Sequence, residues 1–393
     1  MRLFLVAGEP SGDKLGAALM AGLKTLATGV TFDGIGGPLM AAEGLASRVP
    51  IEELSVMGLA EVLPRYFALK RRIRQTARAV IDTAPDALVT IDSPDFCLRV
   101  ARLVREAAPG VPTIHYVAPS VWAWRPGRAA RMARWVDHVL ALLPFEPPYM
   151  QAAGMTCDFV GHPVVAETWA GAPEAAAFRA AHALGPEAPL MLALPGSRRG
   201  EIARLAPVFG ATLAQVARAV PGLRVALPTL PGLAPLVRDL TDDWPVTPVI
   251  VTEDAARRAA FAAADVALAA SGTVSLELGA NRLPMVIAYD MAPLTRWIMA
   301  RLLRIDTVTL VNLVSETRTI PECLGPACRP DIIAPQVAGL LRNPTARAGQ
   351  IAAMQVTMAR LGEGGEAPGL RAARSVLARL EHGAKAPTSR CAE

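Results

Sequence analysis

The sequence holds few of the residues that mark a disulfide-stabilised, metal-binding or membrane-spanning protein. Its five cysteines are scattered over 393 residues, and none has the cysteine or histidine neighbours of a zinc site. It lacks a window of about eighteen uncharged apolar residues, and its first apolar run meets Glu9 too early for a signal peptide. We therefore expect reduced thiols, a cytoplasmic location and, where a membrane is involved, attachment to its surface.

Aromatic residues are also scarce, at 5%, whereas apolar residues as a whole make up 52% of the chain. This composition excludes a disordered protein, and the length suits two domains with separate cores. The net charge of +5 favours an anionic partner, such as a phosphate group, a nucleic acid or an acidic membrane surface, without choosing among them.

Short apolar runs alternate with helical patterns, which is typical of parallel sheets in an α/β protein. We predict one domain at 1–165 and a second at 189–335, joined by an Ala-, Pro- and Glu-rich linker at 166–188 and followed by a helical segment and polar tail at 336–393. Both domains are expected to be Rossmann-like and doubly wound, facing each other across a cleft, with ligands at the carboxyl ends of the strands. The expected strands are Arg2–Ala7, Ala87–Ile91, Thr113–Val117, Val139–Leu143, Cys157–Val160, Leu190–Leu194, Leu223–Leu227, Val249–Thr252, Val266–Ala269 and Met285–Ile287.

The chain has neither a GxGxxG fingerprint nor a Walker A loop, so dinucleotide binding and ATP hydrolysis gain no support. Polar residues instead gather where predicted strands end. The stretch "VAGEPSGDKLG" places Glu9, Ser11, Gly12 and Asp13 at a helix start, where free backbone N–H groups bind anions or sugar hydroxyls. A glycine turn with Ser11 or Asp13 as the N-cap explains the same pattern.

Two further motifs follow strands of the first domain. In "VTIDSPDF", Asp92 ends a strand and is placed to take a proton from an attacking hydroxyl, although Asp92 or Ser93 could equally cap the next helix. In "HYVAPSVWAWRPGR", Ser120, Trp122 and Arg125 combine flat apolar faces with a cation, which fits a sugar, a lipid or RNA. A solvated basic helix with buried tryptophans is the alternative.

The second domain repeats the strand–loop–helix pattern. In "LPGSRRGE", Arg198 offers a guanidinium suited to a diphosphate. In "ASGTVSLELG", Ser271, Gly272 and Thr273 lead into a helix N-terminus that favours anions, and Glu277 lies about one turn deeper. If the ligand is a nucleotide, its ribose hydroxyls would donate to Glu277; an exposed helix glutamate is the alternative.

Together these stretches resemble the lipid-A-disaccharide synthases, a family of inverting glycosyltransferases with the GT-B fold. The motifs "VAGEPSGD", "IDSPDF", "IHYVAPSVWAWR", "LLPFE", "FVGHP", "LPGSRRGE" and "ASGTVSLELGANRLPMV" match in order and spacing, from residue 1 to about 325. The resemblance implies that UDP-2,3-diacylglucosamine and 2,3-diacylglucosamine 1-phosphate (lipid X) are joined through a β-1,6 bond with release of UDP. It also implies that no metal or other cofactor is needed, in agreement with the lack of a clustered Asp-x-Asp motif.

The resemblance also implies roles for individual residues. Asp92 becomes the general base for the acceptor hydroxyl, and Glu9 and Ser11 belong to the active-site loop. The expected contacts of the nucleotide donor are Arg198, Glu277 and Asn312.

Acyl chains require an apolar surface, and "LSVMGLAEVLPRYFALKRRIR" places Met57 and other apolar residues before the cations Lys70, Arg71, Arg72 and Arg74. With acylated substrates, this stretch predicts docking on the inner face of the inner membrane; an ordinary core-facing helix is the alternative. The resemblance further implies a homodimer, with C-terminal helices that pack back or are exchanged, and no nucleic-acid partner.

Three positions depart from the family pattern. Val311 stands before Asn312 where a proline is usual, Arg318 is displaced by one position, and Asp290 replaces a basic residue. The lost positive charge would weaken binding of UDP. Two other functions remain as alternatives: another UDP-sugar enzyme of the same fold, similar to a UDP-N-acetylglucosamine epimerase, or an Arg-rich RNA-binding protein using the segment 122–134.

Overall fold

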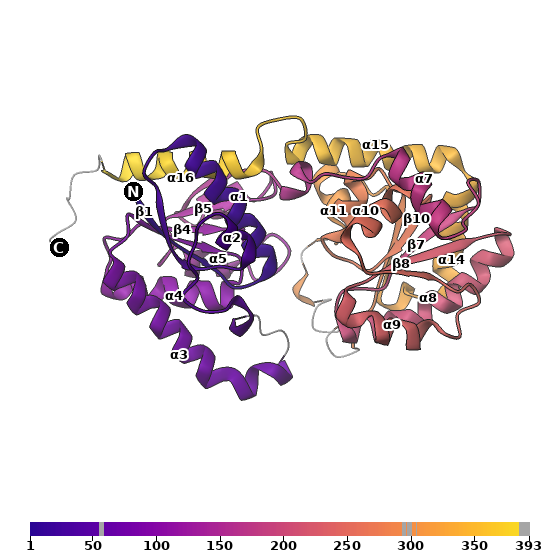
Figure 1. Cartoon of the computed structure of the whole chain (residues 1–393), viewed down its shortest axis with the longest axis horizontal. Coiled ribbons are helices and arrows are strands. Elements are labelled where there is room, and N and C mark those ends of the chain that lie inside the picture. The colour runs from indigo at the N-terminus through magenta and orange to yellow at the C-terminus, as the bar shows by residue number, and fades with distance from the viewer. Residues whose placement is uncertain (55–58, 293–295, 297–300, 304, 385–393) are drawn as a thin grey trace. The chain divides into compact units, whose positions relative to one another are not determined.

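The computed structural model describes residues 1–54, 59–292, 296, 301–303 and 305–384. The chain forms two compact units, and it returns to the first unit at its end (Figure 1). The first unit comprises 1–166 and 364–393, and the second comprises 167–363. The two stretches of the first unit are therefore separated in sequence by the whole of the second.

The first unit is a parallel sheet of six strands in the order β2-β1-β3-β4-β5-β6. Its strands are β1 (Arg2–Ala7), β2 (Thr31–Ile35), β3 (Ala87–Ile91), β4 (Thr113–Tyr116), β5 (His138–Ala141) and β6 (Thr156–Phe159). Its helices are α1 (Pro10–Leu26), α2 (Pro38–Ala42), α3 (Leu59–Thr83), α4 (Pro94–Ala107), α5 (Gly127–Met132), α6 (Pro147–Gln151) and α16 (Pro368–Ala384), with 3₁₀ turns η1 (Ile51–Glu53) and η2 (Pro163–Ala166). The central strands β1 and β3 are apolar on both faces because helices cover both.

Helices α1 and α16 pack on one face of this sheet, and α3 and α4 pack on the other (Figure 1). Two glycines let α1 and α16 approach closely: a Cβ on Gly22 would lie 2.7 Å from the carbonyl oxygen of Gly369. Hydrogen bonds also join α16 to the sheet. Ser375 Oγ on α16 donates to Asp158 Oδ2 of β6 at 2.6 Å and lies 2.8 Å from His138 Nε2 of β5. The last helix is therefore a structural part of the first unit.

The second unit is also a parallel sheet of six strands, in the order β12-β11-β10-β7-β8-β9. Its strands are β7 (Leu190–Leu194), β8 (Arg224–Pro228), β9 (Val249–Val251), β10 (Val266–Ala269), β11 (Met285–Tyr289) and β12 (Glu322–Leu324). Its helices are α7 (Ala172–Ala181), α8 (Arg199–Ala219), α9 (Ala234–Thr241), α10 (Asp254–Ala263), α11 (Val274–Ala280), α13 (Leu310–Ser315), α14 (Pro330–Arg342) and α15 (Pro344–Leu361), with η3 (Pro231–Leu233) and η4 (Gly325–Ala327). The predicted α/β class with two doubly wound sheets is confirmed.

The stretch predicted as a linker contains α7, which packs on α10 within the second unit. Arg179 of α7 donates to the carbonyl oxygen of Ala263 at 2.6 Å and to Asp265 Oδ2 at 3.2 Å. The helical segment predicted at 336–393 is likewise divided, because α14 and α15 belong to the second unit and α16 belongs to the first. Within the described residues, no helix is both long enough and apolar enough to cross a membrane.

Candidate active site

The strand order places a topological switch point between β1 and β3 in the first unit, where loops leave toward opposite faces of the sheet. The two predicted loops meet there. Ser11 Oγ donates to Asp92 Oδ2 at 2.8 Å, and Ser93 Oγ donates to Glu9 Oε1 at 3.1 Å. Asp92 is half-buried and Ser11 is exposed, so a carboxylate oriented by a hydroxyl lies at the surface where an α/β sheet binds ligands.

The turn that carries Asp92 is held in an uncommon backbone conformation. Asp92 and Ser93 have φ of 53° and 41°, in the left-handed region. The Asp92 N–H donates to the carbonyl oxygen of Tyr116 at 2.9 Å, and a Cβ on Gly8 would lie 2.8 Å from Ser93 Oγ. Such conformations persist where the surroundings fix them, and they concentrate at functional sites.

Asp13 and Gly12, which we expected to contact substrate, are buried and have structural roles. Asp13 is 3% exposed and accepts backbone N–H groups from Gly37, Leu39 and Met40 at 2.8 to 3.0 Å, so its carboxylate holds the start of α2. Gly12 is buried, and a Cβ there would lie 3.2 Å from the carbonyl oxygen of Ile91. The Asp13 carboxylate therefore holds a loop, and the lack of a side chain at Gly12 lets the helix pack on the sheet, while their contacts with substrate stay a prediction.

The loop after β4 carries the predicted residues Ser120, Trp122 and Arg125. Ser120 and Arg125 are exposed, and the Arg125 guanidinium lies 4.3 Å from the centre of the Trp124 ring. Trp122 is half-buried, packs edge-on against Phe145 and donates from Nε1 to Glu146 Oε1 at 3.3 Å. Its indole N–H therefore already has a partner inside the protein.

Glu146 is a residue that the sequence reasoning missed. It is 4% exposed, and its Oε2 accepts the backbone N–H groups of Leu142 and Leu143 at 3.1 and 3.0 Å. Burial raises its pKa to about 7, against the lowering effect of these hydrogen bonds and the one from Trp122. The sequence feature that could have indicated this residue is a single glutamate directly after the apolar run "LALLPF". It lies within a motif that was noted only for its resemblance to the family.

The second unit has its switch point between β7 and β10, and a pocket of about 350 Å³ lies at the carboxyl ends of these strands. Of the predicted residues, it is lined by Ser271, Gly272, Thr273 and Glu277. The helix that follows, α11, has only seven residues. Its dipole is correspondingly small, so recognition at this wall rests on the turn and the side chains.

Glu277 is half-buried and forms an ion pair with Arg257 of α10, and the Arg257 guanidinium lies 5.1 Å from the centre of the Phe261 ring. Both members of the pair line the pocket. The Glu277 carboxylate therefore has a partner within the protein, whereas the sequence analysis assigned it a partner only on the ligand. Arg257 was overlooked, although its place one turn into a helix that follows a strand was visible in the sequence.

Arg198 lies at the rim of this pocket, between lining residues. Its side chain is 63% exposed, and Nη1 donates to Glu201 Oε1 at 3.2 Å. Ser197 and Glu201 line the pocket on either side of it in sequence. The hydroxyl of Tyr289 donates to the same Glu201 oxygen at 3.4 Å, and burial, with the charge of Glu201, raises the pKa of this tyrosine.

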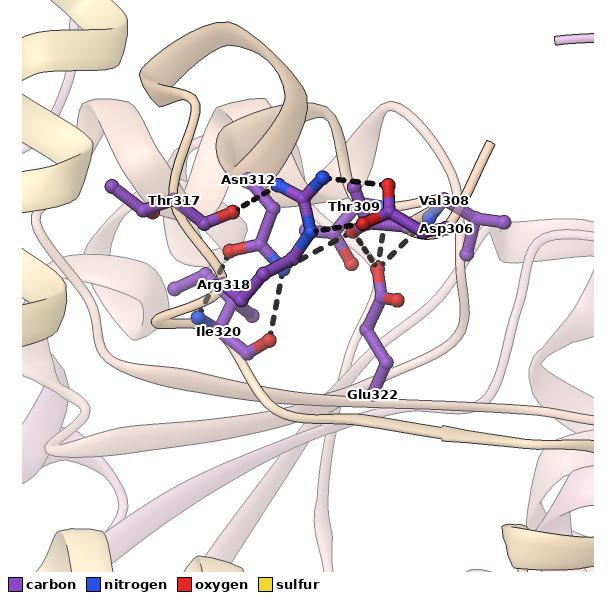
Figure 2. Close-up of polar contacts among 9 residues, drawn as sticks. Asp306, Val308, Thr309, Asn312, Thr317, Arg318, Ile320 and Glu322 are labelled. Carbon is purple, nitrogen blue, oxygen red and sulfur yellow. Dashed lines mark hydrogen bonds and ion pairs between the residues drawn. The ribbon is translucent and has the colours of Figure 1, made fainter. Parts of the chain in front are cut away.

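Asn312 does not line the pocket but stabilises the chain before β12 from inside (Figure 2). It is 1% exposed; Nδ2 donates to the Ile320 carbonyl oxygen at 2.9 Å and to Thr307 Oγ1 at 3.2 Å, and Oδ1 accepts the Ile320 N–H at 3.0 Å. Nearby, Glu322 Oε1 accepts hydrogen bonds from Thr307 Oγ1 and from the backbone of Val308 and Thr309 at 2.7 to 3.0 Å. Asn312 therefore positions this segment, and its contact with the donor stays a prediction.

Of the three positions that depart from the family pattern, Asp290 and Arg318 are ion-paired, and Val311 is buried. Asp290 Oδ1 lies 3.1 Å from Arg296 Nη1, so its negative charge is partly neutralised. Arg318 pairs with Asp306 at 2.6 Å on the surface (Figure 2). Met57 lies outside the described residues. Where the structure describes the chain, no three His, Cys, Asp or Glu side chains group as metal ligands.

The sequence profile of the family described as lipid-A-disaccharide synthetase matches residues 3–366. The chain is 61% identical over 384 residues to a lipid-A-disaccharide synthase of Ruegeria pomeroyi, covering 96% of this chain and 94% of that protein. It is 49% identical over 375 residues to a lipid-A-disaccharide synthase of Rhodospirillum centenum, covering 95% and 93%.

Among solved structures, the chain is similar to a UDP-GlcNAc 2-epimerase of Neisseria meningitidis bound to UDP-GlcNAc, with a TM-score of 0.66 and 12% identity over 97% of this chain and 100% of that one. It is also similar to MurG of Acinetobacter baumannii, with a TM-score of 0.54 and 14% identity over 97% and 99%. At such identities the likeness concerns the fold, and it is a GT-B-like one.

Proposed function

Because the chain belongs to the lipid-A-disaccharide synthase family, it has lipid-A-disaccharide synthase activity in lipid A biosynthesis, and we propose how its residues divide the reaction. The pocket of the second unit takes the donor, UDP-2,3-diacylglucosamine. The first unit takes the acceptor, 2,3-diacylglucosamine 1-phosphate. Glycosyl transfer releases UDP and forms the β-1,6 bond.

Asp92 is the general base in this proposal. Its carboxylate takes the proton of the acceptor 6-hydroxyl while the oxygen attacks the anomeric carbon of the donor sugar. The bond from that carbon to the diphosphate breaks, and its electron pair leaves with UDP, so the configuration at the anomeric carbon inverts. The hydrogen bond from Ser11 to Asp92 at the switch point carries this assignment, because it holds a carboxylate at the ligand-binding edge.

The donor is held by groups from the loops after β7 and β10. Arg198 stabilises the charge that develops on the leaving diphosphate, and its exposed position at the pocket rim supports this role. Glu277 accepts the ribose hydroxyls, and Arg257 orients the carboxylate. Asn312 acts indirectly, by fixing the segment 307–320.

The enzyme works, in this proposal, at the inner face of the inner membrane, where its acylated substrates lie. Phe67 of α3 is 80% exposed, and Lys70, Arg71 and Arg74 on the same helix are exposed cations. Apolar and cationic side chains together suit an anionic lipid surface. We also propose the homodimer that the resemblance implies, which light scattering of the purified protein in detergent tests.

The decisive experiment mixes the purified protein with both lipid substrates in detergent and EDTA and follows the products by mass spectrometry. The disaccharide 1-phosphate together with UDP is the expected result, and its formation in EDTA demonstrates independence from metal. Consumption of the donor without disaccharide, or an epimerised UDP-sugar, contradicts the assignment of acceptor and reaction.

A further inference from the structure

A second large pocket lies in the first unit, between α3, α4 and the segment that begins at Arg125, with a volume of about 670 Å³. We call it the basic pocket. Its lining includes two cations from each of three helices: Lys70 and Arg74, Arg99 and Arg102, and Arg128 and Arg131. The catalytic assignment above uses none of these six side chains.

The side chains that line the basic pocket carry a large excess of positive charge. Among the described residues of its lining, Asp95 is the only carboxylate, and it lies 3.6 Å from Arg128, while Arg102 lies 3.8 Å from Glu106. Within the described part of the chain, the other lining cations have no ion pair. Cations gathered in one concave site repel one another, and an anion that enters relieves this repulsion. The positive potential reaches inward, because Arg128 adds to the burial that lowers the pKa of His115 to about 4.

The basic pocket also has apolar walls. Ile73, Leu98 and Met132 are buried side chains that line it, and Trp135 lines it as well. A ligand suited to this lining has an anionic group for the guanidinium groups and an apolar body for the walls. A phosphate monoester on an acylated sugar has both features.

The position of the basic pocket relates it to the reaction. Pro94 and Asp95 line it, and they follow Asp92 directly on the turn into α4. In the acceptor, the reacting 6-hydroxyl and the 1-phosphate belong to a single sugar ring, in which C5 and C1 both flank the ring oxygen. A phosphate site that begins within three residues of Asp92 fits the distance between these two groups of one sugar.

Donor and acceptor carry the same acylated sugar and differ in the group at C1. A site that tells them apart must therefore recognise this group. Resting on the proposed function, we propose that the basic pocket binds the 1-phosphate of the acceptor glycolipid and so directs its 6-hydroxyl to Asp92. The cations of α4 and α5 make this a specificity-determining site for a phosphate monoester.

The test uses two acceptors, 2,3-diacylglucosamine 1-phosphate and the same lipid with a neutral 1-O-methyl group. The variant R99Q/R131Q removes one exposed cation from each of two helices of the basic pocket. We expect its KM for the phosphorylated acceptor to rise on the order of ten- to a hundredfold with little change in kcat, and its KM for the methyl acceptor to stay unchanged. The matched control is R78Q/R134Q, with the same charge change at exposed positions outside this lining, and it should behave as wild type.

The outcomes separate the two proposals. If the wild type transfers to neither acceptor, the proposed function fails and this inference with it. If the wild type transfers, and R99Q/R131Q keeps its preference for the phosphorylated acceptor, only this inference is overturned. Assays in neutral detergent exclude phospholipid headgroups, and sedimentation with phosphatidylcholine vesicles, with and without phosphatidylglycerol, measures membrane binding. Loss of vesicle binding alone, with the KM ratio intact, would assign the basic pocket to membrane lipids and also overturn the inference.

Discussion

Two carboxylates of the first unit show how the fold sets the chemistry of a single residue. Asp92 is half-buried beside a hydroxyl donor, on a turn that leaves it open to a substrate. Glu146 is buried, and three N–H donors surround it while burial opposes its charge. The same functional group is thus open to a substrate in one case, where we propose proton transfer, and holds the Trp122 loop in the other.

Asp92→Asn tests the base. The amide keeps the shape of the side chain and an oxygen that Ser11 can donate to, but it cannot take a proton. We expect disaccharide formation to be abolished while calorimetry shows UDP affinity close to that of the wild type. An equal loss of both would make Asp92 a structural residue.

Arg198→Ala tests stabilisation of the leaving group. Removing the guanidinium should lower the transfer rate on the order of 10²- to 10³-fold, because developing charge on the diphosphate loses its partner. Arg199→Ala is the control, since the neighbouring residue is also exposed. Near-normal turnover of the Arg198 variant in steady-state assays would remove this residue from the mechanism.

Glu146 predicts a pH dependence of stability. Folding raises its pKa from an ordinary 4.5 to about 7, so folding favours the protonated form. The side chain therefore destabilises the first unit progressively as pH rises from about 4.5 to about 7, by roughly 3 kcal/mol in total. E146Q cannot ionise. As the pH rises from about 5 to about 8, the unfolding temperature of the wild type should therefore decrease relative to that of this variant. The exposed E52Q should show no such trend, and a constant difference for E146Q would contradict the raised pKa.

At the scale of elements, periodicity predicted the central strands well. The bounds of β1, β3 and β7 agree with the prediction, because strands buried on both faces are continuous apolar runs bounded by turn residues. Of the edge strands, β6 and β9 were predicted, whereas β2 and β12 were missed. Strand β2 has only two buried residues, and β12 pairs with β11 over only three residues. Short, half-exposed strands have no such run and are specified by their neighbours.

The features of the candidate site likewise divide into those that the sequence predicted and those that it did not. Loops after strands were predicted correctly as meeting points for polar residues, because topology alone brings the carboxyl ends of parallel strands together. Partners between helices could not be predicted, since only the tertiary fold brings Arg257 of α10 to Glu277 of α11. The interior roles of Asp13 and Asn312 depended on backbone N–H groups 24 and 8 residues away, which no local pattern indicates.

Gly369→Ala tests the packing of α16. Its Cβ would lie 2.6 Å from the carbonyl oxygen of Ala18, so α16 must shift off α1 at a cost of roughly 1–3 kcal/mol. Gly339→Ala is the matched control in α14, where no atom lies within 4 Å of the added Cβ and alanine favours the helix. In calorimetry, G369A should lower the transition of the first unit and G339A should slightly raise that of the second. An unchanged first transition would mean that α16 contributes little to it.

At the scale of the whole molecule, the two units differ in how the chain builds them. The second unit is continuous in sequence, from 167 to 363, and has its own core of buried side chains. The first unit is completed only by the C-terminal helix, whose Ala372, Ala373 and Val376 are fully buried in the core that includes β1 and β3. Helix α16 therefore completes a unit whose other elements all precede the second unit in sequence.

This connectivity predicts different behaviour of fragments. A fragment of residues 167–363 should fold alone and bind UDP, because its core and its nucleotide pocket are complete. A fragment of residues 1–166 should expose the apolar face that α16 covers and unfold or aggregate. Adding a peptide of residues 364–384 should restore cooperative unfolding, followed by circular dichroism. A fragment 1–166 that unfolds cooperatively at the same temperature with and without the peptide would show that α16 is an accessory helix, and that the acceptor unit is specified by its first 166 residues alone.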